Sequence, residues 1–93
     1  MVTAIVMIKA DIQRIPEVAE SIAQIPAVSE VYSVTGDLDL VALVRVRSLE
    51  ELADVIPATL NKVPGVISTE THIAFRTYSR HDLDAAFAIG LAD

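Results

Sequence analysis

Hydrophobic and polar residues follow two different periods along this chain. Four segments have the two-residue period of an extended strand, whose alternate side chains point to opposite faces. Two other segments place hydrophobic residues three and four positions apart, as an amphipathic helix does. The pattern predicts a strand, a helix, two strands, a helix and a strand, over residues 2–10, 15–25, 28–35, 38–46, 49–63 and 66–76.

Turn and capping residues support these boundaries. Pro16 suits the first turn of the first helix, and Pro26 ends that helix. The residues Ser48 to Glu51, SLEE, have the spacing of a capping box at the start of the second helix. Pro57 falls inside the second helix, where a missing backbone N–H and a steric clash cost about 3 kcal/mol, so we expect a kink there. Pro64-Gly65 closes the helix.

The element order βαββαβ is typical of a ferredoxin-like α+β sandwich with a four-stranded antiparallel sheet. The first and third strands are apolar on both faces, as central strands are, whereas the second and fourth alternate like edge strands. In the second strand, Val28, Tyr32 and Val34 are expected to share a face with Glu30. Two helices cover only one face of a sheet, so the other apolar face is predicted to pack sheet to sheet against a second subunit.

A separate helical tail is expected after this domain. Residues 1–78 would form the ferredoxin-like domain, and residues 79–93 a C-terminal helix capped by Ser79 and Asp82. The tail is predicted to pack on the domain or on a neighbouring subunit. Its apolar side consists of Leu83, Ala86, Phe87 and Leu91.

Composition strengthens the case for association between copies. The chain has 93 residues, of which 53% are hydrophobic, and a mean hydropathy of +0.50. A chain of this length buries only about 60% of its unfolded surface, so an interface is the simplest place for the surplus apolar side chains. No segment approaches the roughly 18 apolar residues of a membrane helix, and no secretory signal is apparent, so we expect a cytoplasmic protein without membrane contact.

Charge and residue types argue against several functions. The net charge is −6 and the seven basic residues are scattered, which disfavours direct binding to DNA. Cysteine is absent and His72 and His81 lack the spacing of metal ligands, so we expect no metal and no cofactor. There is no Gly-x-Ser-x-Gly motif, and no catalytic residue is predicted.

The hairpin from Thr35 to Asp39, TGDLD, is the segment most suggestive of ligand chemistry. Its glycine lets backbone N–H groups approach an anion, and its carboxylates can receive an ammonium group, so the segment fits an amino-acid zwitterion. The same residues also suit a type II′ turn with Gly36 at its first central position and Asp37 as a polar turn residue. The residues alone leave both interpretations open.

Two motifs resemble the C-terminal effector domain of the feast/famine (Lrp/AsnC) transcription regulators. They are Tyr-x-Val-Thr-Gly-Asp-x-Asp at Tyr32–Asp39 and Pro-Gly-Val-x-x-Thr-x-Thr at Pro64–Thr71. The resemblance implies a ferredoxin-like fold, dimers that associate further, often into octamers, and an amino-acid effector bound between dimers. The ligand-binding residues it implies are Tyr32, Thr35, Gly36, Asp37, Asp39, Ser68, Thr69 and Thr71.

The resemblance also shapes the expected role. Family regulators carry a helix-turn-helix domain before this one, whereas this chain begins at the first strand, so we expect a stand-alone module without direct DNA binding. It would bind an amino acid, form oligomers and modulate full-length Lrp/AsnC regulators. Two alternatives remain open: a small dimeric α+β barrel enzyme of the oxygenase or isomerase type, and a purely architectural oligomer.

Overall fold

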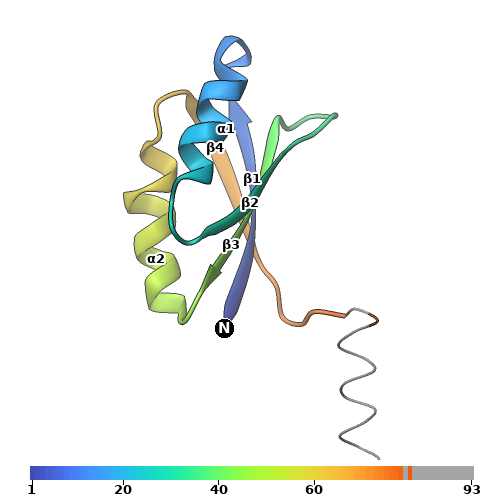
Figure 1. The fold of residues 1–93 in the computed structure, drawn as a ribbon, viewed down its shortest axis with the longest axis vertical. Helices are drawn as coiled ribbons and strands as arrows, with labels where there is room; N and C mark the ends of the chain where they lie inside the picture. The colour runs from blue at the N-terminus through green and yellow to red at the C-terminus, as the bar shows by residue number, and fades with distance from the viewer. Residues whose placement is uncertain (79, 81–93) are drawn as a thin grey trace, which may run out of the picture.

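The structure is a computed structural model that describes residues 1–78 and Arg80. Two helices cover one face of a four-stranded antiparallel sheet (Figure 1), which confirms the ferredoxin-like prediction. The predicted tail helix lies, apart from Arg80, outside the described residues. The elements are β1 (Val2–Ala10), η1 (Ile12–Arg14), α1 (Ile15–Ala23), β2 (Val28–Ser33), β3 (Leu40–Val46), α2 (Leu49–Ala58), η2 (Leu60–Lys62) and β4 (Val66–Ile73), where η marks a short 3₁₀ helix.

The sheet has the strand order β2-β3-β1-β4, so β1 and β3 are central as predicted. Their helix-facing side chains are fully or almost fully buried, and α1, α2 and η2 add further apolar side chains to the same core. Burial of each large aliphatic side chain contributes about 1.5–3 kcal/mol to stability. The fully buried large side chains are Val6, Ile8, Val18, Ile22, Leu40, Val44 and Leu60.

Within the described residues, no helix is long and apolar enough to cross a lipid bilayer.

A β-bulge in β2 changes which of its side chains share a face of the sheet, compared with the prediction. Val28 pairs with Val44, but Glu30 already pairs with the preceding residue, Leu43. The extra residue on β2 interrupts the alternation, so Val28 is 8% exposed and belongs to the core. Tyr32 pairs with Val41 and lies on the other face of the sheet. The prediction that Val28 shares a face with Tyr32 was therefore wrong.

Helix α2 is shorter than the periodicity predicted. It ends at Ala58, one residue after Pro57. Thr59 follows with φ −123° and ψ −61°, outside the helical range, and η2 begins at the next residue. The apolar period continues through η2 because Leu60 still points into the core. Pro57 thus lies in the last turn of α2, rather than at a kink within a longer helix.

The start of α2 has most of the predicted capping box. The Ser48 hydroxyl accepts a hydrogen bond from the Glu51 N–H at 3.2 Å. The Glu51 carboxylate accepts from the Arg47 N–H at 2.6 Å, one residue earlier than the usual partner. Two backbone N–H groups that the helix itself cannot bond are satisfied in this way.

Replacement of Ser48 by alanine will therefore lower the free energy of unfolding by about 1 kcal/mol, measured by urea denaturation. Ser21→Ala is the matched control, since Ser21 is an exposed residue within α1 and alanine favours a helix interior. Equal stabilities of the two variants would contradict a capping role for Ser48.

No described element covers the sheet face opposite the helices (Figure 1). This face carries apolar side chains. Ile5 and Met7 of β1 lie beside Leu43 and Val41 of β3 on this face, and all four are half-buried. Tyr32 of β2 is 47% exposed next to Val41. We call this surface the open sheet face.

Candidate functional site

Three segments that are distant in the sequence meet at one end of the sheet. They are the end of β1 with the residues after it, the base of the β2–β3 hairpin, and the turn that enters β4. Together they line a groove of ≈ 560 Å³, which we call the hairpin groove. Its lining residues include Lys9, Asp11, Arg14, Asp39, Gly65 and Ile67.

Asp39 fixes the base of the hairpin to β1. Its Oδ2 accepts a hydrogen bond from the Ala10 N–H at 2.9 Å in a partly buried position. Its own N–H donates to the Ile8 carbonyl at 3.0 Å, and its carbonyl accepts from the Val34 N–H at 3.0 Å. Asp39 thus has a structural role, and its second carboxylate oxygen remains available to a ligand in the groove.

The tip of the hairpin is exposed, and Lys9 connects it to the sheet. Gly36 has a φ of +107°, in the left-handed region that glycine favours, and a Cβ there would meet no atom within 4 Å. The Lys9 ammonium donates to the Asp37 carbonyl at 3.2 Å. Among the described residues, the carboxylate of Asp37 has no hydrogen-bond partner, and Thr35 is likewise exposed.

The predicted residues of β4 lie on both sides of the sheet. Ser68 pairs with Lys9 and lies close to the groove. Thr69 donates a hydrogen bond through Oγ1 to Oδ1 of Asn61 at 2.7 Å. Thr71 pairs with Val6 and faces the helices, where it borders an apolar groove beside α2.

One subunit therefore brings together only some of the predicted site residues. Asp37, Asp39 and Ser68 are joined by their contacts with the end of β1, and the exposed Thr35 and Gly36 belong to the same hairpin. Of the predicted site residues, only Asp39 lines the groove itself. The Tyr32 hydroxyl donates to the Glu30 carboxylate, away from the groove. Among the described residues, no group of three or more His, Asp or Glu side chains could hold a metal ion.

The groove also contains charged residues that the sequence pattern did not identify. Lys9 and Arg14 bring two cations to it, and Asp11 adds a second carboxylate. Asp11 accepts from the Gln13 N–H at 3.0 Å, which caps η1. The only sequence signal was their position next to the end of a predicted strand, because the neighbours that complete the groove are distant in sequence.

Gly65 allows the close approach of β4 to α1 at this groove. Its φ is +97°, and a Cβ at this position would lie 2.5 Å from Cγ2 of Val18. Its carbonyl accepts a hydrogen bond from the Asp11 N–H at 2.8 Å. The register shift between Lys9 and Ala10 then leaves Ile67 66% exposed at the groove.

Comparison with known proteins gives consistent matches. A family model described as the Lrp/AsnC ligand binding domain matches residues 3–83. HTH-type transcriptional regulator FL11 of Pyrococcus horikoshii is 35% identical over 75 residues, which are 81% of this chain and 49% of the regulator. The chain thus spans about half the length of this curated relative.

Solved structures match the same fold. The crystal structure of a protein from Thermus thermophilus is 50% identical, with a TM-score of 0.80, and the match covers 86% of this chain and 100% of that one. A feast or famine regulatory protein from M. tuberculosis, solved in complex with L-methionine, is 29% identical with a TM-score of 0.72. That match covers 86% of this chain and 54% of the regulator.

Proposed function

The chain belongs to the Lrp/AsnC ligand-binding domain family, and from this premise we propose that it binds an amino-acid effector at the hairpin groove. The resemblance inferred from the hairpin and Pro-Gly motifs is confirmed by the family match over residues 3–83. The curated relative is named as a transcriptional regulator, and the M. tuberculosis relative is in complex with L-methionine. These names support a regulatory binding function.

The mixed charge of the hairpin groove is the observation that carries the proposal. Lys9 and Arg14 line the groove and are cations suited to a carboxylate. Asp37 lies beside the groove on the hairpin tip, where Lys9 bonds its backbone carbonyl, and its exposed carboxylate is suited to an ammonium group. Ile12 and Ile67 are 80% and 66% exposed at the same groove and offer apolar contacts to an effector side chain. The volume of ≈ 560 Å³ is within the usual range for small-molecule sites.

We propose that the open sheet face forms a dimer interface. Ile5, Met7 and Leu43 are half-buried within one subunit, and a second copy packed sheet to sheet would remove their remaining surface from water. Further contacts between dimers, up to an octamer, would cover the exposed Ile67 and Phe75, which are 66% and 101% exposed. Such contacts would also close the hairpin groove, which is open in one subunit.

As a module, the protein would modulate full-length regulators of its family, of which the matched segment is about half. The enzyme alternative requires a His, Tyr or Arg in an apolar cleft between sheet and helices. His72 instead lies on an exposed strand surface, with its Nε2 3.5 Å from the Glu70 carboxylate, and Tyr32 lies on the open sheet face. His72 and Tyr32 therefore do not supply such a group.

Thermal unfolding in the presence of each common amino acid tests the proposed function. An effector at about 100 times its dissociation constant stabilises the folded state by roughly 2.7 kcal/mol. A selective rise in unfolding temperature with one or a few amino acids is the expected result. An unchanged unfolding temperature across the whole panel would contradict effector binding and favour the architectural alternative.

Replacement of Asp37 by asparagine will weaken effector binding by about tenfold or more, because the variant loses a charge-assisted hydrogen bond to the ammonium group. The fold should be unaffected, since the Asp37 side chain is exposed and its carboxylate bonds no other described residue. Asp39 is unsuitable for this test because it holds the Ala10 N–H. Isothermal titration calorimetry measures the affinity.

The matched control for this experiment is Asp54→Asn, which makes the same change in charge at an exposed position of α2. It should bind the effector like the unmodified protein. If Asp37→Asn and Asp54→Asn bind equally well, Asp37 is not part of the site.

A further inference from the structure

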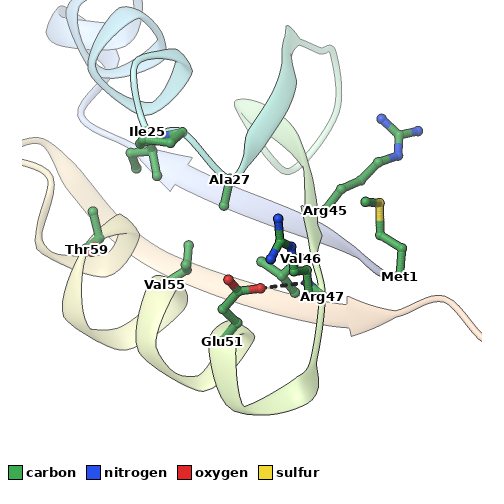
Figure 2. Close-up of a pocket in the computed structure, with 10 residues that line it drawn as sticks. Met1, Ile25, Ala27, Arg45, Val46, Arg47, Glu51, Val55 and Thr59 are labelled. Carbon is green, nitrogen blue, oxygen red and sulfur yellow. Dashed lines mark hydrogen bonds between the residues drawn. The ribbon is translucent and has the colours of Figure 1, made fainter.

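A second cavity lies at the opposite end of the sheet from the hairpin groove. It has a volume of ≈ 450 Å³ and is bordered by Met1, the turn between α1 and β2, the end of β3 and one side of α2 (Figure 2). The strand β1 runs from this cavity to the hairpin groove, and its nine residues span about 30 Å. The two cavities are therefore separate sites.

Part of the wall of this cavity is apolar and continuous with the core. Ile25 and Val46 are 8% and 4% exposed and belong to the buried core. Ala27 and Val55 are partly buried and pack against that core. A ligand with an aliphatic body would therefore bury its surface against side chains that are already held in place by the fold.

Two arginines supply positive charge to the same cavity. Figure 2 shows the Arg47 guanidinium turned inward, toward Ala27 and Val55, while Arg45 points outward at the rim. Within the described part of the chain, neither guanidinium lies within 4 Å of a carboxylate oxygen. A guanidinium is a planar fork of N–H donors that matches a carboxylate with two parallel hydrogen bonds.

Glu51 limits the negative charge that the cavity can accept. Its Oε2 is held by the Arg47 N–H at 2.6 Å, so the carboxylate stays at the cavity wall (Figure 2). With two guanidinium groups against one carboxylate, the charges favour a ligand with a single negative charge over one with several.

We propose that this cavity is a second small-molecule site, which binds a carboxylate with a short aliphatic body. Arg47 holds the carboxylate, and Ile25, Val46 and Val55 contact the aliphatic part. A simple carboxylic acid and a free aliphatic amino acid share this chemistry. The site is independent of the hairpin groove, so its occupation does not require the effector proposed above.

Isothermal titration calorimetry of the full chain with isovalerate, and separately with leucine, tests this proposal. We expect isovalerate to bind the unmodified protein and Arg47→Gln to bind it about tenfold more weakly or worse, because a charged hydrogen-bond donor is lost. Lys62→Gln makes the same change in charge in η2, away from both cavities, and should bind isovalerate normally.

The titrations with leucine and with Asp37→Asn separate the two sites. Leucine binding that is lost in Arg47→Gln but kept in Asp37→Asn identifies a free amino acid as a ligand of this cavity. Isovalerate binding should also be kept in Asp37→Asn, whether or not the hairpin groove binds an effector. Absence of isovalerate binding to the unmodified protein, or equal binding by Arg47→Gln and Lys62→Gln, would overturn the proposal.

Discussion

Replacement of Gly65 by alanine will lower the free energy of unfolding by about 2–4 kcal/mol. An L-residue in the left-handed region costs about 1–2 kcal/mol, and Gly65 has a φ of +97°. The new Cβ would also lie 2.5 Å from Cγ2 of Val18, a side chain that is 1% exposed in the core. Overpacking of a core typically costs a further 1–3 kcal/mol, because the neighbours can move only a little. Urea denaturation at fixed protein concentration measures the loss.

Gly36→Ala is the matched control for this substitution. Gly36 also has a positive φ, +107°, but a Cβ there would meet no atom within 4 Å, so only the backbone cost of about 1–2 kcal/mol remains. In addition, Val18→Ala removes the clashing methyl group, so its effect and that of Gly65→Ala should be non-additive in a double-mutant cycle. Equal losses for Gly65→Ala and Gly36→Ala would refute the steric argument.

The same glycine connects stability to the proposed binding site. The Gly65 carbonyl accepts from the Asp11 N–H, and both residues line the hairpin groove. A shift of the chain at Gly65 would displace the start of β4, including Ile67, relative to Lys9. We therefore expect Gly65→Ala to weaken effector binding even under conditions in which the variant is fully folded.

Much of the fold was predictable because its signals are local. The period of each segment identified the four strands and two α-helices of the described residues, and a strand that is apolar on both faces, such as residues 2–10, indicated a central position. The bulge in β2 was not predictable in this way. Whether Val28 faces the core depends on its pairing with Val44, and a partner 16 residues away leaves no trace in the alternation of β2 itself.

The candidate site was less predictable than the fold. The hairpin motif drew attention to Asp39, but its bond to the Ala10 N–H joins residues 29 positions apart and gives it a structural role. In the sequence, Lys9 and Arg14 are two of several scattered basic residues. The structure brings them together at the hairpin groove, beside the turn at Gly65. Arg47 was overlooked for the same reason, since its apolar neighbours come from the turn between α1 and β2, from β3 and from α2.

Replacement of Ile5 by aspartate will convert the proposed sheet-to-sheet dimer into monomers. Ile5 lies on central strand β1, on the open sheet face, between Leu43 of β3 and His72 of β4. In a sheet-to-sheet dimer the new carboxylate would be buried without a compensating partner across the interface, which costs several kcal/mol for each charge. A twofold interface would contain the change twice. Light scattering measures the mass of the assembly, and circular dichroism verifies that the variant is folded.

The control for this experiment is Leu49→Asp, which introduces the same charge at a hydrophobic residue that is 57% exposed. Leu49 is the first residue of α2, on the opposite side of the sheet, where an acidic side chain also favours the helix N-terminus. This variant should keep the mass of the unmodified protein. If Ile5→Asp keeps that mass as well, the open sheet face is not a dimer interface.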